Sequence, residues 1–148
     1  MRLIRTLVTA CLLAALALPA SAQAASAPEI MLRKVNAVRA QHGLAGLRAS
    51  PSLNASAAGY SHWLMATDNF GHLASIGASR SFDRLGEVLA IHGGRKGRIT
   101  RTVRRWMGSP GHRAVILDSS FRYFGAGRTV GRFRGRRATI WVGQFGMR

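Results

Sequence analysis

The chain has 148 residues, of which 22 are lysine or arginine, five are aspartate or glutamate and one is cysteine, giving a formal charge of +17. A single cysteine excludes a disulfide-stapled scaffold, and the length is sufficient for one domain with its own hydrophobic core. The apolar run near the N-terminus is well short of the roughly 20 residues that a membrane-spanning helix requires, and no later segment comes close.

The N-terminus has the composition of a secretory signal peptide. Arg2 and Arg5 precede an apolar run over residues 7–18, and small residues then offer cleavage after Ala22 or Ala24. This order of a basic, an apolar and a small-residue region predicts export from the cytoplasm.

We therefore expect residues 1–24 to be removed and residues 25–148 to form a single domain that is secreted or periplasmic. Two arginines leave with the signal peptide, so the formal charge falls from +17 to +15. We expect a monomer without a transmembrane segment, drawn by its charge to anionic components of the cell envelope.

Two helices are predicted in the first half of the domain. Residues 29–42 carry apolar side chains at helical spacing and end before a glycine. Residues 50–67 begin with a serine and a proline, a pair favoured at a helix start. Residues 68–83 lack periodicity and are expected to form a loop that carries His72.

A strand and a helix follow this loop. Residues 85–91 alternate as a strand, on which Glu87 is the odd member, because a carboxylate on an apolar strand must be paired, hydrogen-bonded or facing a cavity. Residues 99–107 form an amphipathic helix whose polar face is rich in arginine.

A short helix over residues 112–117 is predicted after Ser109 and Pro110, with Ser109 as its N-cap. His112 then falls in the first turn, where the helix dipole disfavours a positive charge. A neutral imidazole at this place can accept a proton or bind a metal ion.

Residues 121–130 and 137–145 are predicted to be strands. In the second, Ile140 and Val142 point to one face and Trp141 and Phe145 to the other, so both faces must be covered. Helices on both sides of one sheet make a three-layer α/β/α sandwich, an α/β fold.

Several short motifs occur in a fixed order and together resemble the bacterial, disulfide-free branch of the CAP superfamily. This superfamily includes cysteine-rich secretory proteins, antigen 5 and pathogenesis-related proteins, and its domain is also called the SCP domain. The matching motifs are Asn36-x-x-Arg39, Gly43-Leu44, Phe70-Gly71-His72, Gly86-Glu87, Trp106-Met107-x-Ser109-Pro110-Gly111-His112-Arg113, Gly125-x-Gly127 and Trp141-x-x-Gln144-Phe145-Gly146.

The resemblance implies a mixed, mostly antiparallel sheet between helices, and a cavity that in some members holds zinc or another divalent cation. By position, His72, Glu87 and His112 are the metal-ligand candidates, and they line the cavity together with Ser109. Two departures from the family pattern count against a full metal site. Ser109 stands where eukaryotic relatives have a second acid, and Val88 replaces an asparagine common after the first acid.

Three functions remain open. The favoured hypothesis is a non-enzymatic binding module whose cavity engages a lipid, glycan or peptide at the cell envelope or outside the cell. A second is a divalent-metal-dependent hydrolase that uses His72, Glu87 and His112, with Glu87 as ligand or general base. No residue is assigned a catalytic role, because the sequence has neither an HExxH nor a GxSxG motif.

The third hypothesis is a polyanion-binding protein that acts through its arginines. Aromatic residues are not regularly interleaved with these arginines, so sequence-specific nucleic-acid recognition is not expected. The candidate anion-binding residues are Arg98, Arg101, Arg104, Arg105, Arg132, Arg134, Arg136 and Arg137.

Overall fold

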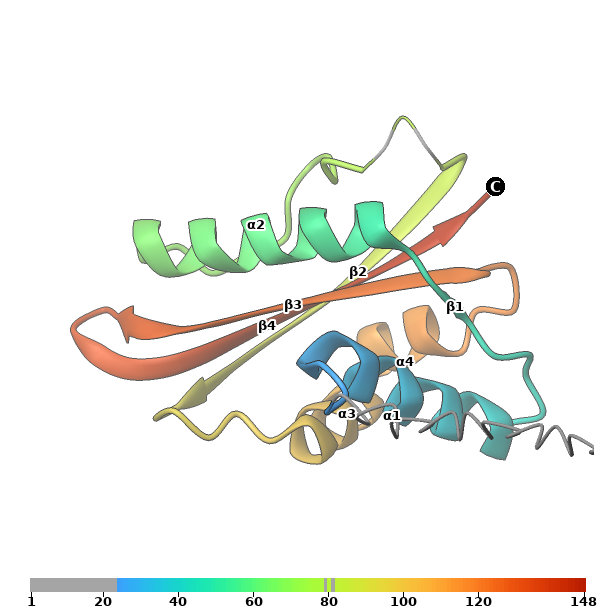
Figure 1. Cartoon of the computed structure of the whole chain (residues 1–148), viewed down its shortest axis with the longest axis horizontal. Helices are drawn as coiled ribbons and strands as arrows, with labels where there is room; N and C mark the ends of the chain where they lie inside the picture. Colours follow the sequence, from blue (N-terminus) through green and yellow to red (C-terminus); the bar gives the residue numbers. More distant parts are fainter. Residues whose placement is uncertain (1–23, 79, 81) are drawn as a thin grey trace, which may run out of the picture.

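Three layers make up the computed structural model, which describes residues 24–78, 80 and 82–148. The helices are α1 (Ala27–Gln41), α2 (Pro51–Thr67), α3 (Ile99–Met107) and α4 (Pro110–Ile116). The strands are β1 (Arg48–Ala49), β2 (Arg84–Gly93), β3 (Tyr123–Phe133) and β4 (Arg136–Met147). Helix α2 covers one face of the sheet and α1, α3 and α4 cover the other (Figure 1), which confirms the predicted three-layer sandwich.

The sheet is mixed and mostly antiparallel, as expected. Its strand order is β1-β3-β4-β2, with β1 parallel to β3 and the two remaining pairs antiparallel. The two-residue strand β1 was not predicted, because two residues are too few to show an alternating pattern.

Residues 1–23 lie outside the described residues, so the signal peptide stays a prediction from composition. From residue 24 onward, the helices that the structure describes are all too short or too polar to cross a membrane.

The two faces of β4 belong to two separate parts of the core. Ile140 and Val142 pack in a cluster with residues of α2, whereas Trp141 and Phe145 pack in a cluster with Trp106 of α3. All five side chains are almost completely buried. The alternation seen in the sequence therefore sets which layer each residue stabilises.

Helix α2 rests directly on the backbone of β3. A Cβ atom at Gly127 would lie 2.2 Å from the carbonyl group of Ala57, and one at Gly125 would lie 2.3 Å from the backbone of the same helix. The side-chain oxygen of Asn54 accepts a hydrogen bond of 2.9 Å from the Ala126 N–H. The two glycines therefore fix the height of α2 above the sheet.

Arg39 of α1 holds the opposite layer together. Its side chain is 1% exposed, and its guanidinium donates to the carbonyl oxygens of Ala45, Ile116 and Asp118 at 3.0, 2.7 and 2.9 Å. Burial lowers the pKa of this guanidinium, and the nearby Asp118 carboxylate opposes that shift. Arg39 thus ties α1 to the end of α4 and satisfies the buried carbonyl of Ile116.

Candidate functional site

Glu87 and Gln144 form the base of the site on the sheet. The two residues are directly paired across β2 and β4, so their side chains leave the same face, toward α2. Gln144 Nε2 donates to Glu87 Oε2 at 3.0 Å. The Glu87 side chain is 5% exposed, so this carboxylate has the hydrogen-bonded environment that its strand position required.

His72 reaches the same carboxylate from the loop after α2. Its Nδ1–H donates to Glu87 Oε1 at 3.0 Å, and about half of its side chain is exposed. Because Nδ1 is used in this bond, Nε2 is the ring nitrogen that a ligand would meet. Glu87 therefore orients His72 and holds it against the sheet.

His112 completes the cluster from the first turn of α4, where the sequence predicted it. Its ring centroid lies 6.1 Å from that of His72, with the planes inclined by 53°. Burial lowers the pKa of His112, and the neighbouring His72 lowers it further. The lowered pKa favours the neutral form of the ring, and burial is its main cause.

Ser109 directly precedes α4 at the N-cap position, but its side chain forms no capping hydrogen bond. The predicted N-cap position of Ser109 is thus confirmed, and α4 begins at Pro110, although the Ser109 hydroxyl does not satisfy a backbone N–H of the helix. Its role in lining a cavity with the histidines stays a prediction. We refer below to His72, Glu87, His112 and Gln144 as the polar cluster.

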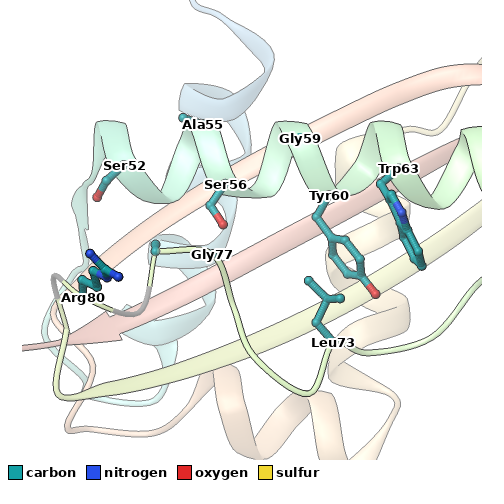
Figure 2. A pocket seen from close by; sticks show the side chains of 10 residues that line it. Ser52, Ala55, Ser56, Gly59, Tyr60, Trp63, Leu73, Gly77 and Arg80 are labelled. Atoms are coloured by element: carbon teal, nitrogen blue, oxygen red, sulfur yellow. The ribbon is translucent and has the colours of Figure 1, made fainter.

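An apolar groove of about 710 Å³ runs between α2 and the loop that follows it (Figure 2). Tyr60, Trp63 and Leu73 lie together at one end of this α2 groove, with Ser52 and Arg80 at the other. The Tyr60 and Trp63 rings stack with centroids 5.7 Å apart. Trp63 and Leu73 are 43% and 39% exposed, which is unusual for side chains of this size.

Tyr60 connects the α2 groove to the polar cluster. Its hydroxyl donates to the carbonyl oxygen of Gly71, the residue before His72, while its ring lines the groove. Burial raises the pKa of Tyr60, and the negative charge of Glu87 raises it further. Leu73 also lines the groove, so the chain from Gly71 to Leu73 passes directly from one feature to the other.

The model of the cysteine-rich secretory protein family, CAP, matches residues 32–145 of this chain. The chain belongs to the CAP family. No curated protein shows significant similarity to the sequence. The family assignment therefore rests on the match over the domain, and solved structures supply the comparison of the fold.

Three solved structures show how this CAP domain compares with known ones. An outer surface protein of Borrelia burgdorferi is 22% identical with a TM-score of 0.66, over 80% of this chain and 90% of its own. An extracellular SCP-domain protein of Bacillus anthracis is 21% identical with a TM-score of 0.64, and the match covers 82% of this chain and 40% of that protein. Venom allergen-like protein 4 of Schistosoma mansoni is 13% identical with a TM-score of 0.64, and the match covers 81% of this chain and 87% of that protein.

The family resemblance implies a metal ion, but this CAP domain offers an incomplete set of ligands for one. His72 Nε2 and His112 supply two imidazoles, and Glu87, whose side chain is 5% exposed, is held by hydrogen bonds from His72 and Gln144. Within the described ranges, no group of three or more His, Cys, Asp and Glu side chains is arranged to hold a metal ion. Since zinc sites use at least three protein ligands, the donors as placed do not fit one.

All eight arginines singled out in the sequence are exposed, and none belongs to the polar cluster. One group belongs to α3 and the residue before it, and the other to the hairpin that the end of β3, the turn and the start of β4 form. The solvent-facing orientation predicted for the α3 arginines is therefore confirmed.

Sequence reasoning missed two parts of the site. Gln144 was noted as part of a motif, but its partner depends on the register between β2 and β4. The α2 groove was also missed. The sequence indicates it only through Tyr60 and Trp63, which are three residues apart and therefore lie on one side of a helix.

Proposed function

We propose that this CAP domain is a monomeric, non-enzymatic binding module that acts at the cell envelope or outside the cell. The observation that carries the proposal is the connection, through Tyr60, between the apolar α2 groove and the polar cluster. A site of this kind suits a ligand with an apolar segment and a polar end, as found among lipids, glycans and peptides.

The two ends of the ligand would meet different chemistry. Tyr60, Trp63 and Leu73 offer apolar and aromatic surface that is already partly exposed, so a ligand would remove it from water. His72 Nε2 and the neutral His112 ring offer polar atoms for hydrogen bonds to the other end of the ligand.

The polar cluster supports binding better than hydrolysis. A general base must reach the proton it removes, whereas the Glu87 side chain is 5% exposed and its two oxygens accept hydrogen bonds from His72 and Gln144. Glu87 in this geometry positions His72 rather than acting on a substrate.

The proposed location has two independent supports. Relatives of the same fold are an outer surface protein and an extracellular protein. Residues 1–24 of this chain also have the composition of a secretory signal peptide.

A titration with a dansyl-labelled fatty acid tests the proposal. Trp63 lines the groove, whereas Trp106 and Trp141 are buried in the core, so the part of the energy transfer to the dansyl group that is lost in Trp63→Phe reports occupancy of the α2 groove. The double variant His72→Ala/His112→Ala is expected to retain the far-ultraviolet circular dichroism of the wild type and to lose at least 10-fold in affinity. His62→Ala, which changes an exposed histidine of α2, is the matched control.

Undiminished probe affinity in the double variant would contradict a role for the polar cluster. Unchanged affinity in Trp63→Ala, measured by dansyl anisotropy, would contradict binding in the groove. Sedimentation velocity on the ligand-free protein tests the monomer, and a stable dimer at micromolar concentration would overturn that part of the proposal.

A further inference from the structure

Two basic grooves meet at the end of β2. One, the α3 groove, has a volume of about 940 Å³ and is lined by the cationic residues Lys96, Arg98, Arg101 and Arg104. The other, the hairpin groove, has a volume of about 490 Å³ and is lined by Arg134, Arg136 and Arg137. Gly93, the last residue of β2, lines both grooves, so the two hollows are neighbours.

These cationic side chains are exposed, and no acidic residue lines either groove. The ion pairs His72–Glu87 and Arg84–Asp118 involve no groove residue. Asp68 is the carboxylate that approaches the hairpin, where Oδ1 accepts the backbone N–H of Arg134. Among the residues that the structure describes, no carboxylate therefore offsets the repulsion among the cationic side chains that line the two grooves, and a bound anion would reduce this repulsion.

The chemistry and the shape of this surface indicate the class of ligand. Guanidinium groups bind phosphate oxygens through two parallel hydrogen bonds, and six of the seven cationic residues are arginine. Two hollows in succession suit a flexible chain that enters both, whereas a flat bilayer would contact mainly their rims.

We propose that the α3 groove and the hairpin groove together bind a linear chain of phosphate groups. This surface is separate from the polar cluster. Glu87 and Gly93 are six residues apart on β2, which corresponds to about 20 Å along a strand. Phosphate-chain binding can therefore be tested independently of any ligand in the α2 groove.

The test uses two inorganic probes, tripolyphosphate and long-chain polyphosphate, and measures affinity at several salt concentrations. The variants are Arg98→Gln/Arg101→Gln in the α3 groove and Arg136→Gln/Arg137→Gln in the hairpin groove. Arg33→Gln/Arg48→Gln makes the same charge change at exposed positions of α1 and β1 and serves as the control. All six side chains are exposed, so the fold is expected to be retained in each variant.

We expect long-chain polyphosphate to bind much more tightly than tripolyphosphate, because only the long chain can enter both grooves. Each groove variant should weaken its binding about 10-fold or more and reduce the slope of log K against log salt by about 1.4, from two lost contacts at about 0.7 each. The control should change affinity about twofold or less.

Three results would overturn the proposal. Equal losses in the control and the groove variants would show that net charge alone attracts the polymer. Equal affinity for both probes would show that the grooves do not act together. Vesicles of anionic phospholipid that bind as tightly, with the same dependence on the groove arginines, would identify the surface as a membrane contact.

Discussion

Replacing Gly127 by alanine tests the contact that positions α2. The new Cβ would lie 2.2 Å from the backbone of Ala57, whereas ordinary contacts begin at 3.4 Å. Helix α2 would have to withdraw by about 1.2 Å, the difference between these two distances, or β3 would have to bend. The atoms that the new Cβ meets are the backbone carbonyl carbon and oxygen of Ala57, and an alanine Cβ cannot rotate away, so no side-chain rotation relieves the clash.

We expect Gly127→Ala to lower the free energy of unfolding by about 3 kcal/mol, the upper end of the range for overpacked cores. For a domain of this size, that corresponds to a decrease in Tm of about 10 °C. The midpoint of urea unfolding, followed by tryptophan fluorescence, measures the effect. Since α2 carries Tyr60 and Trp63, affinity for a probe in the α2 groove should fall as well.

Gly59→Ala is the matched control on the same helix. A Cβ at Gly59 meets nothing within 4 Å, so the substitution should stabilise the protein by about 0.5 to 1 kcal/mol through helix propensity and a less flexible unfolded chain. A Gly127→Ala protein with the wild-type urea midpoint, or a Gly59→Ala protein that is less stable than it, would refute the account of α2 packing.

Further predictions concern buried and titrating groups. Arg39→Met should destabilise the protein by about 3 to 5 kcal/mol in urea, because three carbonyls, of which that of Ile116 is buried, lose a charged donor; a loss below about 1 kcal/mol would contradict this role. The pKa values of His92 and His112 lie below the ordinary value, chiefly through burial. Just below pH 6.5 the unfolded chain therefore binds more protons than the folded protein. The free energy of unfolding should be highest above that pH and should decrease as pH falls toward the folded-state pKa values. The urea midpoint measured from pH 7.5 to 5 checks this, and a constant midpoint would refute it. Glu87→Gln should bring the pKa of Tyr60 closer to its ordinary value, measured by tyrosinate absorbance, because it removes the charge that helps to raise it; an unchanged titration would contradict the electrostatic link.

The layers of the fold could be predicted because they depend on local alternation. Ile140, Trp141 and Val142 alternate faces along one strand, and burial on both faces requires a helical layer on each side. Glu87 could be predicted as a site residue for a similar reason, since a carboxylate within an apolar strand needs a partner. These inferences use residues within a few positions of one another.

The remaining features depend on contacts between distant parts of the chain. Gln144 meets Glu87 only because β2 and β4 pair in one register, and a shift by one residue would turn Gln144 to the opposite face. The α2 groove forms where a non-periodic loop brings Leu73 beside Tyr60, which no repeating pattern encodes. The contact between α2 and β3 likewise depends on Gly125 and Gly127, whose importance appears only when the helix is in place.

The length of β2 has a consequence for how the two proposed binding surfaces act together. Glu87 near its start and Gly93 at its end belong to one rigid strand, so an occupant of one surface leaves the other open. A CAP domain held by its arginines on a fixed anionic polymer would keep the α2 groove within a small volume around the anchoring point. Ligands present on the same polymer would then be met at a high effective concentration, so a groove of modest intrinsic affinity would be sufficient to retain them.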